Sequence, residues 1–208
     1  MKLYHFPISP NSRRVVAVLH HLDLACELQA LDLSKGEHMQ PYFLSLNPNH
    51  MIPTLVDGDF VLWESNAIMQ YLCSKAPDNS LWPMDPKNQA DVSRWQFWQA
   101  SHFGRACGVF IYEHLVKKFL NQGEPDASEI AKAEDSFHRF ASVLEAHLAG
   151  REWLVGDGVT LADLSVGSFL DLAEMAQYPI ASYAEILRWY GNIGQLPAWQ
   201  SSAPAKIA

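Results

Sequence analysis

A serine and an asparagine stand near the amino terminus where a helix is expected to begin. Ser9 and Asn11 follow a strand pattern at residues 2–6, and Pro7 and Pro10 force a loop between this strand and the helix. A hydroxyl at a helix start lies in a positive local potential. It can donate a hydrogen bond to a bound thiolate and lower the pKa of that thiol. Simple capping of the helix is the alternative, and both readings stay open.

The segment 47–68 carries groups that suit the backbone of an extended peptide. Met51, Ile52 and Pro53 precede a strand pattern. A cis bond before the proline would turn the amide and carbonyl of Ile52 outward, where they can pair with a peptide as an added strand does. A trans proline at the start of an edge strand is the alternative, and in isolation it is the commoner case.

Glu64 and Ser65 lie at the next junction of strand and helix. Ser65 is predicted to be the N-cap, and helix N–H groups attract carboxylates. Glu64 can accept hydrogen bonds from an ammonium group, so an amino acid would find partners for both of its charges. His38 and His50 lie in or beside the neighbouring polar segment and can each pair with a carboxylate. The alternatives are an ordinary helix cap and solvated loop histidines.

The elements that position these groups fall into two sets. The predicted order of the first is strand, helix, strand, strand, strand, helix, over residues 2–6, 11–22, 26–31, 54–56, 60–63 and 65–74. Strand, helix and strand in about thirty residues predict a right-handed βαβ unit with parallel strands. Asp57-Gly58-Asp59 is a hairpin signal. Residues 35–46 are polar and partly helical.

Prolines and aspartates gather in residues 77–86, which is the composition of a linker. Only helical periods follow, at 87–120 with a kink expected near Gly104 or Gly108, and at 126–148, 161–177, 183–190 and 197–202. The sequence therefore predicts a mixed α/β domain over 1–76, a linker over 77–86 and an all-helical domain over 87–208. Thr160 and Asp163 are expected to form a structural capping box.

The amino-acid composition argues against several classes of function. Of the 208 residues, 49% are hydrophobic and 18% charged, so a well-filled core is expected. The net charge of −8 comes without a basic stripe, which argues against nucleic-acid binding. The three cysteines form no CxxC, and no metal-ligand spacing is present, so a reduced protein without a metal is expected. With neither a transmembrane run nor a signal peptide, the sequence predicts a cytoplasmic protein that does not bind membranes.

In order and spacing these motifs resemble the soluble, cytosolic glutathione S-transferases. The matching features are Ser9 with Arg14-Val15, Asn47-Pro48, Ile52-Pro53-Thr54-Leu55, Glu64-Ser65 and Thr160-Leu161-Ala162-Asp163. The resemblance implies a thioredoxin-like N-terminal domain (βαβ-α-ββα), an all-α C-terminal domain and usually a homodimer. Neither tyrosine nor cysteine occupies the Ser9 position, so the serine-type classes, theta-like or phi-like, match better than the tyrosine or cysteine classes.

The resemblance also implies roles for single residues. Ser9 matches the serine that stabilises the glutathione thiolate, and Asn11 matches an asparagine that helps hold the sulfur in a bacterial and fungal group related to the yeast nitrogen regulator. Ile52 matches the residue before the cis-proline. The γ-glutamyl binders correspond to Glu64 and Ser65, and the residues near the glycyl carboxylate correspond to His38 and His50.

The expected function follows from this resemblance. Glutathione, the co-substrate, would bind as a thiolate and attack a small hydrophobic electrophile to give a thioether. Reduction of a peroxide or disulfide at the same site is one alternative, and a non-catalytic glutathione-binding module is another. The acceptor pocket is expected between the first helix and the long helix. Its candidates, which could equally be ordinary core residues, are Phe6, Phe103, Arg105, Phe110 and Tyr112.

Overall fold

The structure, a computed structural model, describes residues 1–204 and divides the chain into two compact units. The first unit contains residues 1–79 and the C-terminal segment from Gln195, and the second contains residues 80–194. The predicted fold class, a mixed α/β unit and an all-helical unit, is confirmed. Within residues 1–204, every helix is too short or too polar to cross a membrane.

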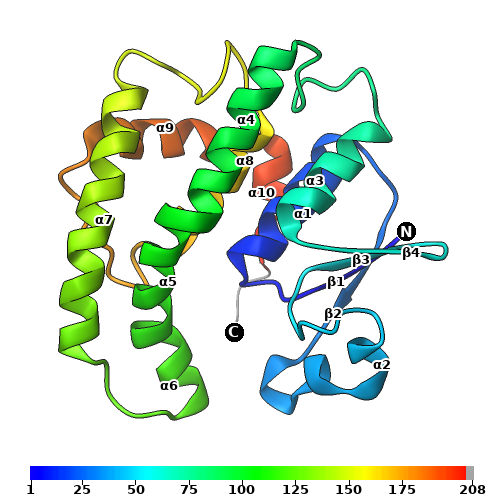
Figure 1. Cartoon of the computed structure of the whole chain (residues 1–208), viewed down its shortest axis with the longest axis horizontal. Coiled ribbons are helices and arrows are strands. Elements are labelled where there is room, and N and C mark those ends of the chain that lie inside the picture. Colours follow the sequence, from blue (N-terminus) through cyan, green and yellow to red (C-terminus); the bar gives the residue numbers. More distant parts are fainter. Residues whose placement is uncertain (205–208) are drawn as a thin grey trace. The chain divides into compact units, whose positions relative to one another are not determined.

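A four-stranded mixed sheet forms the centre of the first unit (Figure 1). Its strands β1 (Lys2–His5), β2 (Glu27–Ala30), β3 (Thr54–Asp57) and β4 (Phe60–Trp63) lie in the order β2-β1-β3-β4. The pairing of β1 with β2 is parallel, as the βαβ prediction requires, whereas β3 is antiparallel to both β1 and β4. Gly58 has a φ of +64° in the β3–β4 turn, a conformation that glycine adopts readily.

The first unit also contains helices. They are α1 (Pro10–His21), α2 (Pro41–Leu44), α3 (Ser65–Ser74) and α10 (Pro197–Ser201), with 3₁₀ turns at Leu33–Lys35 and Glu37–Met39. The helices α1 and α3 pack against each other and bury Val15, Val18 and Ile68 completely. Residues 35–46, which were expected to be polar and partly helical, thus contain the end of the first 3₁₀ turn, the second 3₁₀ turn and α2.

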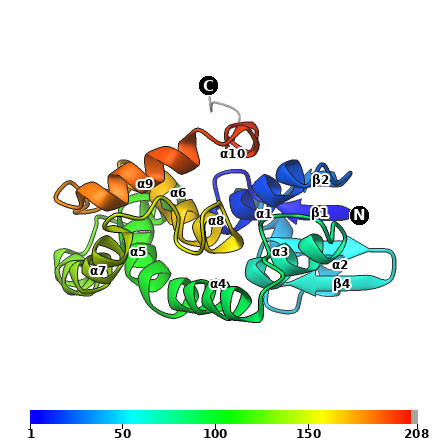
Figure 2. The same ribbon diagram turned by 90° about the horizontal axis from the view of Figure 1, so that it is seen from above.

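The C-terminal segment corrects the predicted domain boundary. Helix α10 lies beside α1 (Figure 2), although residues 87–208 were expected to form one helical domain. The Arg13 guanidinium stacks over the Trp199 ring at 4.3 Å from its centroid and donates to the Trp199 carbonyl at 3.2 Å. Trp199 is buried by this packing, which removes a large apolar side chain from water.

The second unit is a set of helices. Their bounds are α4 (Pro86–Trp98), α5 (Gly104–Ile111), α6 (Lys117–Leu120), α7 (Ala127–Leu148), α8 (Leu161–Gly167) and α9 (Ala184–Gly194). The single helix predicted over 87–120 is divided by two π-helical segments, Gln99–Phe103 and Tyr112–Val116. The first is followed by Gly104, one of the two expected kink positions, where an added Cβ would lie 2.7 Å from the Gln99 carbonyl oxygen. The helix predicted over 161–177 is also shorter. It ends at Gly167, and a 3₁₀ turn at Ser168–Leu172 follows it.

Asp163 organises the start of α8. The predicted capping box is present, since the Asp163 carboxylate accepts from the Thr160 N–H at 2.8 Å and the Thr160 hydroxyl accepts from the Ala162 N–H at 3.3 Å. The other Asp163 oxygen accepts from the Leu154 N–H and from the Trp189 indole, each at 2.9 Å. Burial raises the pKa of Asp163 and these donors oppose that rise. Asp163 therefore joins the loop at Leu154, the start of α8 at Thr160 and helix α9 at Trp189.

Candidate active site

Ser9 is the N-cap of α1. Its hydroxyl oxygen accepts from the Ser12 N–H at 3.4 Å, and its carbonyl accepts from the Arg13 N–H at 2.9 Å. A hydroxyl that accepts a hydrogen bond still has its own hydrogen to donate. Capping and donation to a ligand, the two readings of Ser9, are therefore compatible.

A buried arginine joins the starts of two helices. The Arg14 guanidinium donates to the Ser65 hydroxyl oxygen through Nε at 3.0 Å and through Nη2 at 2.6 Å, and Nη2 also donates to the Asn11 side-chain oxygen. Burial lowers the pKa of Arg14 to about 9, and the charge of Glu64 opposes that change. Because the Asn11 side-chain oxygen accepts from Arg14, the NH₂ group of the same side chain remains available as a second donor beside Ser9.

Ser65 does not cap α3, contrary to the prediction. It is the first residue of the helix, and Glu64 occupies the N-cap position with φ 70° and ψ 106°. The Glu64 side chain makes no capping hydrogen bond to the helix. Its first N–H groups lack intrahelical acceptors by geometry and suit a carboxylate. A non-glycine residue with positive φ is strained, and such strain concentrates at ligand-binding sites.

Asn47 holds the loop that contains Met51, Ile52 and Pro53. Its buried amide donates to the Met51 carbonyl at 2.8 Å and to the Thr54 hydroxyl at 3.0 Å. The Ile52–Pro53 bond is cis, one of the two open possibilities. Within the described residues, no hydrogen bond involves the backbone N–H or carbonyl of Ile52. Both groups can therefore pair with an extended ligand.

The two candidate histidines lie on neighbouring segments of the first unit. His38 belongs to the 3₁₀ turn Glu37–Met39, and its Nδ1 is buried without a partner among residues 1–204. His50 has a φ of 60°, and its Nδ1 lies 3.0 Å from the Met39 sulfur. Both rings are partly exposed, so each can reach a ligand.

The predicted acceptor residues of the helical unit differ in their burial and contacts. Of the two possibilities left open by the sequence, Phe103 and Phe110 are core residues, because both rings are buried and pack against the buried Phe137. The Tyr112 hydroxyl donates to the Gln122 side chain at 3.0 Å. Phe6, in the first unit, is half-buried, and its N–H donates to the Ser12 hydroxyl oxygen at 3.2 Å.

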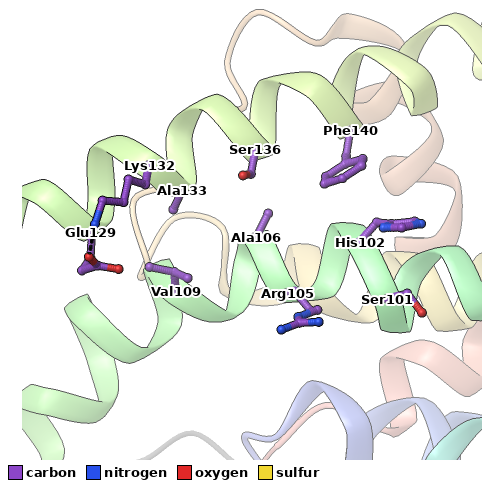
Figure 3. Close-up of a pocket in the computed structure, with 10 residues that line it drawn as sticks. All are labelled: Ser101, His102, Arg105, Ala106, Val109, Glu129, Lys132, Ala133, Ser136 and Phe140. Atoms are coloured by element: carbon purple, nitrogen blue, oxygen red, sulfur yellow. Dashed lines mark hydrogen bonds and ion pairs between the residues drawn. The ribbon is translucent and has the colours of Figure 1, made fainter.

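Arg105 instead borders a surface groove of about 350 Å³ between α5 and α7. Figure 3 shows stacked His102 and Phe140 at one end and the Glu129–Lys132 ion pair at the other, while Arg105 points away from α7. Small side chains, Ala106 and Ala133, form its floor. Arg105 thus remains an exposed charge on the helical unit. Within residues 1–204, no group of three or more His, Cys, Asp or Glu side chains could hold a metal.

Two comparisons identify the family. The family models for the glutathione S-transferase N-terminal and C-terminal domains match residues 3–80 and 104–197. The chain is also 36% identical to glutathione S-transferase 3 of Zea mays, over 99% of this chain and 94% of that protein. The chain belongs to the glutathione S-transferase family. This membership confirms the predicted enzyme class, with glutathione as its co-substrate.

Solved glutathione transferases have the same fold over nearly the whole chain. The structure of glutathione S-transferase III in apo form is 37% identical, with a TM-score of 0.85 over 97% of this chain and 94% of that one. Glutathione transferase F7 of Populus trichocarpa is 29% identical, with a TM-score of 0.88 and coverage of 97% and 96%. A transferase of Pseudomonas putida, solved with glutathione disulfide bound, is 26% identical, with a TM-score of 0.87 and coverage of 97% and 89%. The thioredoxin-like and helical domains of the prediction are confirmed.

Two residues that position the candidate site were not singled out by the sequence prediction. Arg14 and Asn47 were noted only as part of the family pattern, yet each orients several candidate residues. The available signal was residue type: an arginine inside the apolar pattern of α1 and an asparagine before a proline loop both suggest buried hydrogen bonding.

Proposed function

We propose that this transferase conjugates glutathione to a small hydrophobic electrophile and that Ser9 and Asn11 stabilise the glutathione thiolate. The observation that carries this proposal is the Asn11–Arg14–Ser65 hydrogen-bond network. It ties the donors at the start of α1 to the start of α3 through one buried cation. A thiolate bound beside Ser9 gains two donors and a nearby positive charge, all of which favour the anion.

The γ-glutamyl end of glutathione would bind at the start of α3. Its α-carboxylate would accept from the first N–H groups of α3, and its ammonium would pair with the exposed Glu64 carboxylate. A related glutathione S-transferase I was solved with lactoylglutathione, and the related Ure2p was solved with glutathione. These complexes support glutathione as the ligand of the proposed site.

The rest of the tripeptide would follow the cis-proline loop. Ile52, between Met51 and Pro53, offers one N–H and one carbonyl to the cysteinyl backbone. His38 and His50 are the partners proposed for the glycyl carboxylate. The bound thiolate attacks the electrophile, a carbon–sulfur bond forms, and the leaving group departs with its electron pair. The enzyme contributes positioning and thiolate stabilisation, as a homodimer in the cytoplasm by family resemblance.

Replacing Ser9 by Ala tests the mechanism. Losing one donor to the thiolate is expected to raise the pKa of bound glutathione by about 1 to 2 units and to lower kcat about 10- to 100-fold. The thiolate absorbance near 240 nm against pH and the transfer rate with an aryl halide measure both effects. Asn11→Ala in parallel shows which donor dominates, and Ser45→Ala on the exposed end of α2 is the control. Unchanged thiol pKa and kcat in both variants would exclude these residues as the activating groups.

The Asn47→Ala variant tests the loop. Without the two amide donors, the Met51 carbonyl and Thr54 hydroxyl lose a partner, and the Ile52 backbone is held less firmly. We expect the KM for glutathione to rise about tenfold, with a smaller change in kcat, because the loop binds rather than activates. Asn49→Ala is the matched control, since Asn49 only donates to Asn47. An unchanged KM would show that the loop conformation does not depend on Asn47.

Peroxide or disulfide reduction remains the second candidate, because the Pseudomonas putida relative contains glutathione disulfide. In that reaction two glutathione molecules are oxidised to the disulfide while the peroxide is reduced to alcohol and water. Parallel assays with an aryl halide, a hydroperoxide and a mixed disulfide separate these activities. Binding of glutathione without any turnover would favour a non-catalytic module, and absence of binding would overturn every glutathione-based proposal.

A further inference from the structure

Two histidine–methionine pairs meet in the first unit. His38-Met39 ends a 3₁₀ turn, and His50-Met51 lies in the loop before β3. The His50 Nδ1 lies 3.0 Å from the Met39 sulfur. A thioether is only a weak hydrogen-bond acceptor, so a close approach of ring nitrogen to sulfur places two metal-ligand atoms side by side without a strong bond between them.

Both segments are fixed by other hydrogen bonds. The turn that contains Met39 follows Gly36, and the Glu37 carboxylate accepts from the Asp32 N–H at 2.8 Å. The His50 N–H donates to the Asn47 carbonyl at 3.1 Å. The nitrogen and the sulfur are therefore presented by anchored backbone rather than by freely moving chain.

The donor set is soft. Imidazole and thioether together favour Cu(I) over magnesium, calcium or manganese, which prefer oxygen ligands. Further soft donors stand on the same two pairs: the His38 Nδ1 is unpartnered among residues 1–204, and the Met51 side chain is 67% exposed. The neighbouring Glu37 carboxylate is already engaged with Asp32.

We propose that Met39 and His50 bind a soft monovalent cation, Cu(I) or its analogue Ag(I). Metal–nitrogen and metal–sulfur bonds of about 2.0 and 2.3 Å fit this pair if the two atoms separate by about half an ångström. Rotation of the flexible methionine side chain supplies that movement. The ion is no cofactor of the transfer reaction.

A consequence rests on the proposed function. If His50 binds the glycyl carboxylate of glutathione, the metal removes that partner, and the two ligands oppose each other. The metal then lowers the affinity of the protein for glutathione by the same factor by which glutathione lowers its affinity for the metal. The site would make the transferase sensitive to soft metals.

The binding test uses the full chain carrying Cys26→Ser, because Cys26 is the one partly exposed thiol among the described cysteines. Cu(I) is titrated against the chelator bicinchoninate without glutathione, and folding is checked by circular dichroism. We expect Met39→Leu and His50→Gln each to weaken Cu(I) at least about tenfold. Met84→Leu, at an 81% exposed methionine of the helical unit, is the control and should have no effect. Equal Cu(I) affinity of all variants overturns the proposal.

The consequence is tested with S-methylglutathione, which has no thiol to capture the metal. Its affinity is measured by calorimetry with and without one equivalent of Ag(I). We expect at least a threefold loss with Ag(I) in the Cys26→Ser protein and none in the Met39→Leu variant. The same loss in both proteins overturns the assigned site. Failure of S-methylglutathione to bind at all counts against the proposed function, whereas the chelator titration still decides the metal site.

Discussion

An Arg14→Met variant is expected to lose about 100- to 1,000-fold in kcat/KM for glutathione conjugation while keeping its fold. Arg14 orients two groups at once, the Ser65 hydroxyl and the Asn11 amide, and its charge lies near the proposed thiolate. Removal of a preorganised donor alone lowers catalysis about 100- to 1,000-fold. Methionine has no charge to bury, but the buried Ser65 hydroxyl and the Asn11 side-chain oxygen lose their donor, so the free energy of unfolding should fall by about 1 to 3 kcal/mol while the fold is kept.

Two further variants separate charge from geometry. Arg14→Lys keeps the positive charge but lacks the planar fork that reaches both partners, so it should recover only part of the activity. Arg13→Met is the matched control, since its guanidinium packs on Trp199 instead. It should retain activity and show its effect in the stability of the C-terminal segment. Steady-state kinetics and urea unfolding of all three variants measure these outcomes. Equal activity of Arg14→Met and the parent would contradict the network proposal.

The first unit was largely predictable because its signals are local. The Asp57-Gly58-Asp59 hairpin and the helix over 65–74 follow from turn residues and periodicity, and the structure has them at these positions. The role of Ser65 was predicted wrongly because a serine at a helix start is usually a cap. Here its hydroxyl accepts from Arg14, a partner 51 residues away. No local pattern indicates that contact, or the positive φ of Glu64.

The helical unit shows a different limit. Periodicity located its helices, but it cannot distinguish a phenylalanine that lines a pocket from one in the core, because both occupy the apolar face. For Phe103 and Phe110 the sequence therefore left acceptor pocket and core equally open, and in the structure both rings pack on Phe137. The return of residues 195–204 to the first unit also depends on a distant contact, that of Trp199 with Arg13.

The buried carboxylate at the start of α8 leads to the largest expected loss of stability. In an Asp163→Ala variant, the Leu154 N–H, the Thr160 N–H and the Trp189 indole N–H would remain buried without their present acceptor. Each such donor costs about 1 to 3 kcal/mol. A loss of about 4 to 6 kcal/mol is a large part of the 5 to 15 kcal/mol typical of a native protein. For a chain of this size it corresponds to a fall in Tm of about 10 to 20 °C.

Graded variants keep this prediction testable even if Asp163→Ala does not fold. Thr160→Val removes the hydroxyl that accepts from the Ala162 N–H and donates to Asp163, but it leaves the carboxylate in place. It should lose about 1 to 2 kcal/mol. Asp157→Ala, at an exposed position of the preceding loop, should change stability by less than about 0.5 kcal/mol. Urea unfolding followed by tryptophan fluorescence ranks the three. If Asp163→Ala were no less stable than Thr160→Val, the carboxylate would not be what joins Leu154, Thr160 and Trp189, and α8 would be held by apolar packing alone.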